Sequence, residues 1–287
     1  MLLGIFAGLS LCAAAGVCFA AEAFASLAWL WILPVSFLGS LLGLIVLFAL
    51  FVLLLSALVD QDTPQEKDSK LYRTAIVLLA DLAFSIARVR VHPRGLENIP
   101  KNGRFLLVCN HLHEADPVVL LRHLPESQLA FIAKQEVKGM FAVGKLMHKI
   151  LCQPINREND KEALRTIIKC IQIVKDDLAS VAVFPEGYIH KDRKFYPFRA
   201  GVFKIAQKAN VPVVVCTITN THNIIGNFLK LKPTDVDLHL LTVIPAEEVT
   251  AVKTVELADR IYHIMAEDLG EAYRPAQPDD EIKEENA

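Results

Sequence analysis

A histidine and an aspartate five positions apart, His111 and Asp116, lie in a polar loop between two apolar runs. The run before the loop (105–109) predicts a buried strand, and the run after it (118–124) is typical of a helix with Pro117 in its first turn. Enzymes with α/β folds place reactive groups where a strand ends in such a loop. A carboxylate on one ring nitrogen fixes the imidazole tautomer, so the other nitrogen can remove a proton from a hydroxyl. Because no serine or cysteine in the loop is placed as a nucleophile, the pattern indicates a base that activates a hydroxyl on a bound substrate.

Two other interpretations of this loop stay open. Histidine and aspartate are both common in loops, so His111 and Asp116 also fit a simple turn cap. Together with His113 and Glu114 they are crowded enough for a metal site, but no later histidine follows with recognisable ligand spacing. We therefore favour the base, expect no metal and no cofactor, and interpret His113 as a loop or surface residue.

Residues 1–59 are strongly apolar and contain no lysine or arginine. A membrane span needs about 20 apolar residues, so this region can supply one span at 37–58 and a weaker one at 2–21. Two tryptophans and a proline lie between these runs, where they fit an interfacial belt and a helix break: Trp29, Trp31 and Pro34. A cleavable signal peptide competes for the first run, although the basic segment of such signals is missing. We expect a retained helical hairpin, with a single span plus an interfacial helix as the alternative.

The charge distribution predicts an integral protein of the cell membrane whose remaining chain faces the cytoplasm. Every basic residue lies at Lys67 or later, and several follow the apolar region closely. The body of the chain has a small excess of basic residues, which suits an anionic lipid surface but is too weak to indicate nucleic acid. The six cysteines form no C-x-x-C pair and are interpreted as reduced, buried residues.

The rest of the chain alternates short apolar runs with helical patterns, which predicts an α/β domain with a largely parallel, mixed sheet flanked by helices. We expect a membrane anchor at 1–59, a polar linker and membrane-proximal helix at 60–84, the α/β domain at 85–273 and an acidic, disordered tail at 274–287. Strands are expected at 88–92, 105–109, 129–133, 152–155, 180–184, 211–217 and 236–244. Helices are expected at 71–90, 135–150, 160–176, 199–209 and 255–269.

Polar residues follow other predicted strands too. Arg157 comes after one strand, and Glu186 with Gly187 after another. A basic group follows these: Lys191, Arg193, Lys194, Arg199 and Lys204. The carboxyl ends of parallel strands share one crevice, and arginine holds phosphate with two parallel hydrogen bonds. Each feature also has an ordinary explanation, namely a surface ion pair, a plain turn and a membrane-facing surface. Their recurrence at strand ends favours a phosphate-bearing hydroxyl substrate.

Four short motifs now resemble those of the glycerolipid acyltransferases of the 1-acylglycerol-3-phosphate acyltransferase type, in the family's order. The motifs are Asn110-His111 with Asp116-Pro117, then Pro154-Ile155-Asn156-Arg157, Phe184-Pro185-Glu186-Gly187, and Val211-Pro212-Val213-Val214-Val215. Phe198-Arg199-Ala200-Gly201 is similar to the basic-x-Gly element between the third and fourth motifs. The resemblance covers residues 85–245.

The resemblance implies a glycerol-3-phosphate acyltransferase-like fold and acyl transfer to the sn-2 hydroxyl of 1-acylglycerol-3-phosphate, giving phosphatidate. The donor would be acyl-CoA or acyl-carrier protein. His111 would be the general base oriented by Asp116, while Arg157, Glu186, Gly187 and Arg199 would hold the glycerol phosphate. Backbone N–H groups and Lys134 are the candidates for stabilising the oxyanion. Four apolar side chains are candidates for lining an acyl groove: Phe131, Met140, Phe141 and Met147.

One departure from the family matters for the substrate. The arginine common after the third motif is replaced by Ile189. An acyltransferase acting on another lysolipid is therefore an alternative. A non-catalytic membrane protein that binds lipid and a thioesterase that uses the same base on water are two more.

Overall fold

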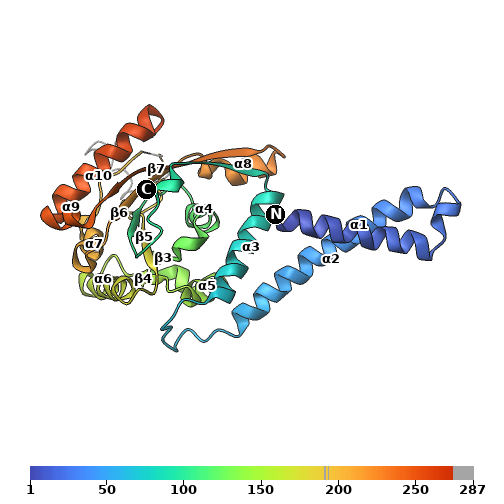
Figure 1. Cartoon of the computed structure of the whole chain (residues 1–287), viewed down its shortest axis with the longest axis horizontal. Helices are drawn as coiled ribbons and strands as arrows, with labels where there is room; N and C mark the ends of the chain where they lie inside the picture. Colours follow the sequence, from blue (N-terminus) through green and yellow to red (C-terminus); the bar gives the residue numbers. More distant parts are fainter. Residues whose placement is uncertain (191, 193, 274–287) are drawn as a thin grey trace.

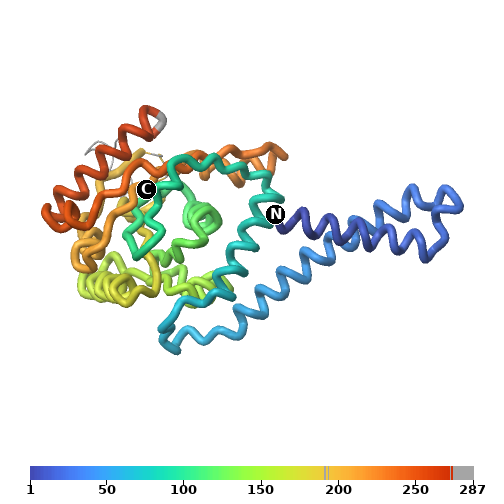
Figure 2. The backbone as a smooth tube through the Cα atoms, in the orientation of Figure 1, coloured from blue at the N-terminus to red at the C-terminus, as the bar shows by residue number. Residues whose placement is uncertain are grey.

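The computed structural model describes residues 1–190, 192 and 194–273. It consists of an α/β domain from which a long helical hairpin projects (Figures 1 and 2). The hairpin is made of α1 (Leu2–Ala20) and α2 (Trp29–Ala57). Both helices are long and apolar enough to cross a membrane, and most of their surface is exposed in the structure. The predicted acidic tail lies outside the described residues.

In the described part of the chain, one mixed sheet has seven strands in the order β1-β7-β6-β2-β5-β3-β4. Strands β6, β2, β5, β3 and β4 run parallel, β7 is antiparallel to β6, and β1 is parallel to β7. The predicted mixed, largely parallel sheet is confirmed. The strand bounds are β1 Val89–Arg94, β2 Leu106–Val108, β3 Leu129–Lys134, β4 Gln153–Ile155, β5 Ser180–Val183, β6 Val213–Ile218 and β7 Thr234–Ile244.

Helices cover both faces of this sheet (Figure 1). Alternate residues of β2 point to opposite faces, so Leu106 and Val108 join one apolar core while Leu107 joins the other. The first core is closed by α6, α7, α9 and α10, and the second by α3, α4 and α8. The helix bounds are α3 Lys70–Ile86, α4 Asp116–His123, α5 Val143–Lys149, α6 Asp160–Lys175, α7 Lys204–Ala209, α8 Ile224–Leu229, α9 Ala246–Ala251 and α10 Thr254–Leu269.

The segment between the hairpin and α3 is bound along the domain rather than hanging free. Arg73 of α3 holds the Asp68 carboxylate at 2.6 Å and donates to the Leu129 carbonyl at 3.0 Å. His148 contacts the Thr63 carbonyl at 3.0 Å. Helix α3 itself packs against the domain through buried residues such as Phe84.

The expected helix break at Pro34 is wrong. Helix α2 begins at Trp29 and continues through Pro34, so Trp31 also lies within the helix. Pro34 is only the sixth residue, and its missing N–H leaves one carbonyl near the helix start without a donor. Apolar spans tolerate such a proline when the rest of the helix is long.

Candidate active site

The loop between β2 and α4 brings the imidazole of His111 onto the carboxylate of Asp116. The His111 Nδ1 lies 2.8 Å from Asp116 Oδ2, which also accepts the backbone N–H groups of Leu112 at 2.6 Å and His113 at 2.8 Å. Asp116 is fully buried. Because an ionised carboxylate only accepts hydrogen bonds, Nδ1 carries the proton and Nε2 remains available as a base.

Neighbouring strand ends hold this imidazole in place. The ring stacks on Phe184, which follows β5, with 4.2 Å between the ring centroids. Asn110 is buried and exchanges two hydrogen bonds of 2.8 Å with the backbone of Ile218 at the end of β6. The histidine loop is therefore attached to strands on both sides of β2. The sequence motif included Asn110 but did not indicate that it ties the loop to β6.

Glu186 lies behind the loop and is buried. Its Oε1 accepts the His111 backbone N–H at 2.9 Å, and its Oε2 accepts the Tyr196 backbone N–H at 3.2 Å. Burial raises the pKa of Glu186 to about 8, although the two backbone donors act in the opposite direction. Both oxygens are thus engaged by the protein. This geometry suits a residue that positions the loop better than one that binds a phosphate.

Two arginines from different loops meet at one aromatic ring. The guanidinium carbons of Arg157 and Arg199 lie 4.8 Å and 5.3 Å from the centroid of the Tyr188 ring. Gly187 has a φ of +91°, and a Cβ there would lie 2.9 Å from Arg199 Nε. A glycine is required by both the backbone angle and the close arginine. The sequence did not point to Tyr188 as part of the site; its place directly after Glu-Gly was the available signal.

In the part of the chain that the structure describes, these two guanidiniums are not paired directly with carboxylates. Among the described residues, neither Arg157 nor Arg199 has a salt-bridge partner. Burial lowers the pKa of Arg157, and the neighbouring positive charge of Arg199 lowers it further. The pair forms a local excess of positive charge at the carboxyl end of the sheet.

The remaining predicted residues make other contacts. Lys134, at the end of β3, is exposed and pairs with Glu136 at 2.9 Å. Of the four candidates for an acyl groove, Phe131 is buried in the core, whereas Met140 and Phe141 are exposed. Cys109 precedes Asn110, but burial raises the pKa of its thiol well above the usual value, so the thiolate is disfavoured. In the described part of the chain, no cluster of three or more His, Cys, Asp or Glu side chains is arranged to hold a metal.

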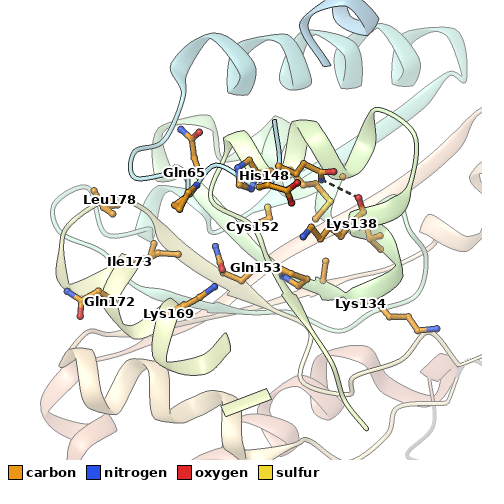
Figure 3. Close-up of a pocket in the computed structure, with 18 of the residues that line it drawn as sticks. Gln65, Lys134, Lys138, His148, Cys152, Gln153, Lys169, Gln172, Ile173 and Leu178 are labelled. Atoms are coloured by element: carbon orange, nitrogen blue, oxygen red, sulfur yellow. Dashed lines mark hydrogen bonds between the residues drawn. The ribbon is translucent and has the colours of Figure 1, made fainter. Parts of the chain in front are cut away.

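A cavity of about 430 Å³ lies at the edge of the sheet, beside β4 (Figure 3). Met147 and Cys152 contribute apolar wall, while Lys134, Lys138 and Lys169 contribute charge. None of its lining residues belongs to the loop that carries His111 and Asp116. The cavity is therefore separate from the histidine–aspartate pair.

The fold and site define a class of enzyme: an α/β acyltransferase with a histidine–aspartate pair at the end of a central parallel strand. The sequence profile of the acyltransferase family matches residues 89–219. A probable 1-acyl-sn-glycerol-3-phosphate acyltransferase of Mycoplasma pneumoniae is 30% identical over 190 residues, which are 63% of this chain and 70% of the relative. The chain belongs to this family of 1-acyl-sn-glycerol-3-phosphate acyltransferases.

More distant relatives agree with this assignment. The human 1-acyl-sn-glycerol-3-phosphate acyltransferase alpha is 25% identical over 62% of each chain. The Saccharomyces cerevisiae enzyme is 27% identical over 63% of this chain and 61% of its own. This chain therefore spans less than two thirds of the length of these two relatives. The crystal structure of the 1-acyl-sn-glycerophosphate acyltransferase PlsC from Thermotoga maritima has the same fold, with a TM-score of 0.52, 23% identity, and coverage of 76% of this chain and 88% of that one.

Proposed function

We propose that this protein transfers a fatty acyl group from acyl-CoA or acyl-carrier protein to the sn-2 hydroxyl of 1-acylglycerol-3-phosphate. The product is phosphatidate, and the reaction belongs to phospholipid biosynthesis. The observation that carries the proposal is the 2.8 Å contact between His111 Nδ1 and the buried Asp116 carboxylate. It supplies an imidazole of fixed tautomer in a chain of the acyltransferase family.

The reaction follows from that geometry. Nε2 of His111 removes the proton of the lysolipid hydroxyl as the oxygen attacks the thioester carbonyl, and Asp116 stabilises the imidazolium that forms. The tetrahedral intermediate collapses with loss of the thiolate, which takes up the proton held by His111. Backbone N–H groups are our candidates for stabilising the oxyanion. Lys134 remains a second candidate, which has to leave Glu136 to take part.

The head group is assigned to the two arginines at Tyr188. A phosphate monoester carries nearly two negative charges, which match the uncompensated guanidiniums of Arg157 and Arg199. Arg199 reaches over Gly187, two residues before Ile189, where the family commonly has an arginine. In this proposal Arg199 supplies the charge that Ile189 lacks. Glu186 and Gly187 act indirectly, by holding the histidine loop and by leaving room for Arg199.

The apolar hairpin supports a function at a membrane. Two apolar helices precede the domain, and all lysines and arginines follow them. We propose that the protein is an integral protein of the cell membrane, with its catalytic domain on the cytoplasmic side. Acceptor and product are both bilayer lipids, so a tethered site meets them at high local concentration.

The test is an acyl-transfer assay of the purified protein with acyl-CoA and acyl-carrier protein as donors. The acceptors are lysophosphatidate, lysophosphatidylcholine and lysophosphatidylglycerol. We expect His111→Ala to reduce turnover by about 10³-fold or more, because the base is lost. The matched control is His113→Ala, whose imidazole caps the neighbouring backbone instead of contacting Asp116. Equal turnover of His111→Ala and wild type contradicts the mechanism, and release of free fatty acid without an acceptor identifies a thioesterase.

A second variant tests the head group. Arg199→Ala removes one of two phosphate donors, so kcat/KM for lysophosphatidate is expected to fall about 10- to 100-fold. The rate with lysophosphatidylcholine, which lacks the second negative charge, is expected to change little. Arg165→Ala, on the exposed side of α6, is the control. Equal losses for both acceptors argue against a phosphate-binding role.

A further inference from the structure

Helix α8 and the turn after it expose a group of large apolar side chains on the α/β domain itself. Ile225, Phe228, Leu229 and Leu231 are 56%, 43%, 76% and 78% exposed. Four such residues within seven positions exceed the scattered apolar side chains that a soluble surface usually carries. We refer to these four residues as the α8 patch.

The backbone of the α8 patch has a defined, hydrogen-bonded conformation that includes one energetically unfavourable residue. The Lys232 N–H donates to the Asn227 carbonyl at 2.8 Å, and the Leu231 N–H donates to the Phe228 carbonyl at 3.0 Å. This is the Schellman arrangement of a helix end, which favours glycine at the left-handed position. Here that position is Leu231, with a φ of +55°. Leu231 therefore has a strained backbone conformation although its side chain is exposed and makes few contacts that could offset the strain.

The surroundings of the patch are positively charged. Lys230 and Lys232 alternate with its leucines, and Arg88 donates to the Leu231 carbonyl at 2.8 Å. The sequence contains no aspartate or glutamate between Asp192 and Asp235. Exposed apolar side chains flanked by cations match the two layers of an anionic membrane surface, namely acyl chains below and negative head groups above.

The patch also lies where the hairpin leaves the domain. Arg88 follows the end of α3, and the amino group of Met1, at the start of α1, pairs with Asp81 of the same helix at 2.9 Å. Arg88 lies seven positions after Asp81, which is about 10 Å along the helix axis. Figures 1 and 2 show α8 at the end of the domain from which α1 and α2 project. Helix α8 and the apolar hairpin thus lie at the same end of the domain.

We infer that the α8 patch inserts into the interface of the bilayer that receives the hairpin, as a second membrane contact specific for anionic lipid. The hairpin alone is a single stalk about which the domain can tilt. A second contact removes that freedom and fixes the orientation of the domain on the lipid surface. The inference rests on the proposed membrane attachment, and the experiment below separates the two.

The test uses the full chain in lipid nanodiscs, with a fluorophore that reports the polarity of its surroundings. In a Cys12→Ala background, Leu229→Cys receives the fluorophore in the patch, and Leu164→Cys, on α6, receives it at a comparably exposed leucine elsewhere. The unsubstituted chain carries the fluorophore at Cys12, the exposed cysteine of α1, and reports the hairpin. The five other cysteines are buried and do not react in the folded protein.

With phosphatidylglycerol in the nanodisc, we expect blue-shifted emission and loss of fluorescence to brominated lipid at position 229 but not at position 164. Both effects should weaken in pure phosphatidylcholine. Quenching at Cys12 without quenching at position 229 overturns the inference and leaves the hairpin attachment standing. Absence of quenching at both sites overturns both. Blue-shifted emission at position 229 without quenching by brominated lipid overturns the inference. It indicates that a second copy of the chain covers the patch.

The Leu231→Gly variant tests whether reduced quenching at position 229 could be caused by misfolding instead of lost membrane contact. Glycine suits the left-handed position, so the variant should be at least as stable as wild type in detergent. Its loss of one inserted leucine should nevertheless reduce quenching at position 229. Unchanged quenching in this variant, together with unchanged quenching in Lys230→Glu/Lys232→Glu, shows that neither the leucine nor the lysines drive the contact and overturns the proposed specificity for anionic lipid.

Discussion

The imidazole of His111 is fixed by contacts of three kinds. Asp116 holds its Nδ1, Phe184 stacks on its ring, and Glu186 accepts its backbone N–H. Such redundancy suits a base that has to keep one tautomer and one direction through each turnover. A substitution of Glu186 should therefore act on the position of the loop rather than on the chemistry itself.

Glu186 predicts a specific dependence of stability on pH. Burial raises its folded-state pKa from 4.5 to about 8, so the unfolded chain loses this proton first as pH rises. The free energy of unfolding should fall between about pH 5 and pH 8, with a slope of at most about 1.4 kcal/mol per unit. Glu186→Gln should remove this slope in denaturant titrations. The exposed Glu256→Gln is the control, and an unchanged slope in Glu186→Gln contradicts the assignment.

At the scale of elements, α3 connects the hairpin, the linker and the site. Its Asp81 accepts from Arg122 of α4 at 2.7 Å and from the Met1 amino group at 2.9 Å. Helix α4 begins with Asp116. The position of the Asp116 carboxylate therefore depends on the packing of α3 against α4.

Asp81→Ala should destabilise this junction. Partial burial raises the pKa of Asp81, but its hydrogen bonds outweigh burial and lower the pKa to about 2. The ion pairs then contribute stability above about pH 4 that is lost as pH falls toward 2. We expect a loss of about 1–2 kcal/mol at neutral pH, measured by unfolding in detergent. Asp259→Ala, in an exposed pair on α10, should change little. Equal effects of the two variants argue against a special role of the junction.

At the scale of the whole molecule, the hairpin and the domain differ in the surface they present. The domain buries its apolar residues in two cores, whereas leucines of α2 such as Leu42 and Leu47 are 62% and 63% exposed. An apolar surface of this kind needs a bilayer or a partner to cover it.

A double substitution to arginine tests whether a bilayer covers the apolar surface of α2. Leu42→Arg/Leu47→Arg places two charges near the middle of α2, at about 3 kcal/mol each if the helix spans a bilayer. We expect the variant to leave the membrane fraction on washing with alkaline carbonate, while wild type remains. Leu164→Arg, an equally exposed leucine on α6, should behave as wild type. Retention of the double variant contradicts insertion of α2.

Much of this arrangement could be predicted because its signals are local. Alternation with period two and runs of β-branched residues set each strand, and helical periodicity set α6 and α10, so the element order followed from neighbouring residues. The rule that parallel strands end at one edge predicted Arg157 and Glu186 near His111, and Glu186 does accept the His111 backbone N–H. The error at Pro34 arose because a proline breaks helices in water but not in a long apolar span.

The sequence by itself determined which chemical groups the loops carry and that two long apolar segments precede them. Only the tertiary structure decided where those groups point. Glu186 turns inward onto the backbone of the histidine loop, and Tyr188 gathers Arg157 and Arg199 from loops more than forty residues apart. The direction of a side chain depends on the packing of distant strands and helices, and spacing along the chain does not encode that packing.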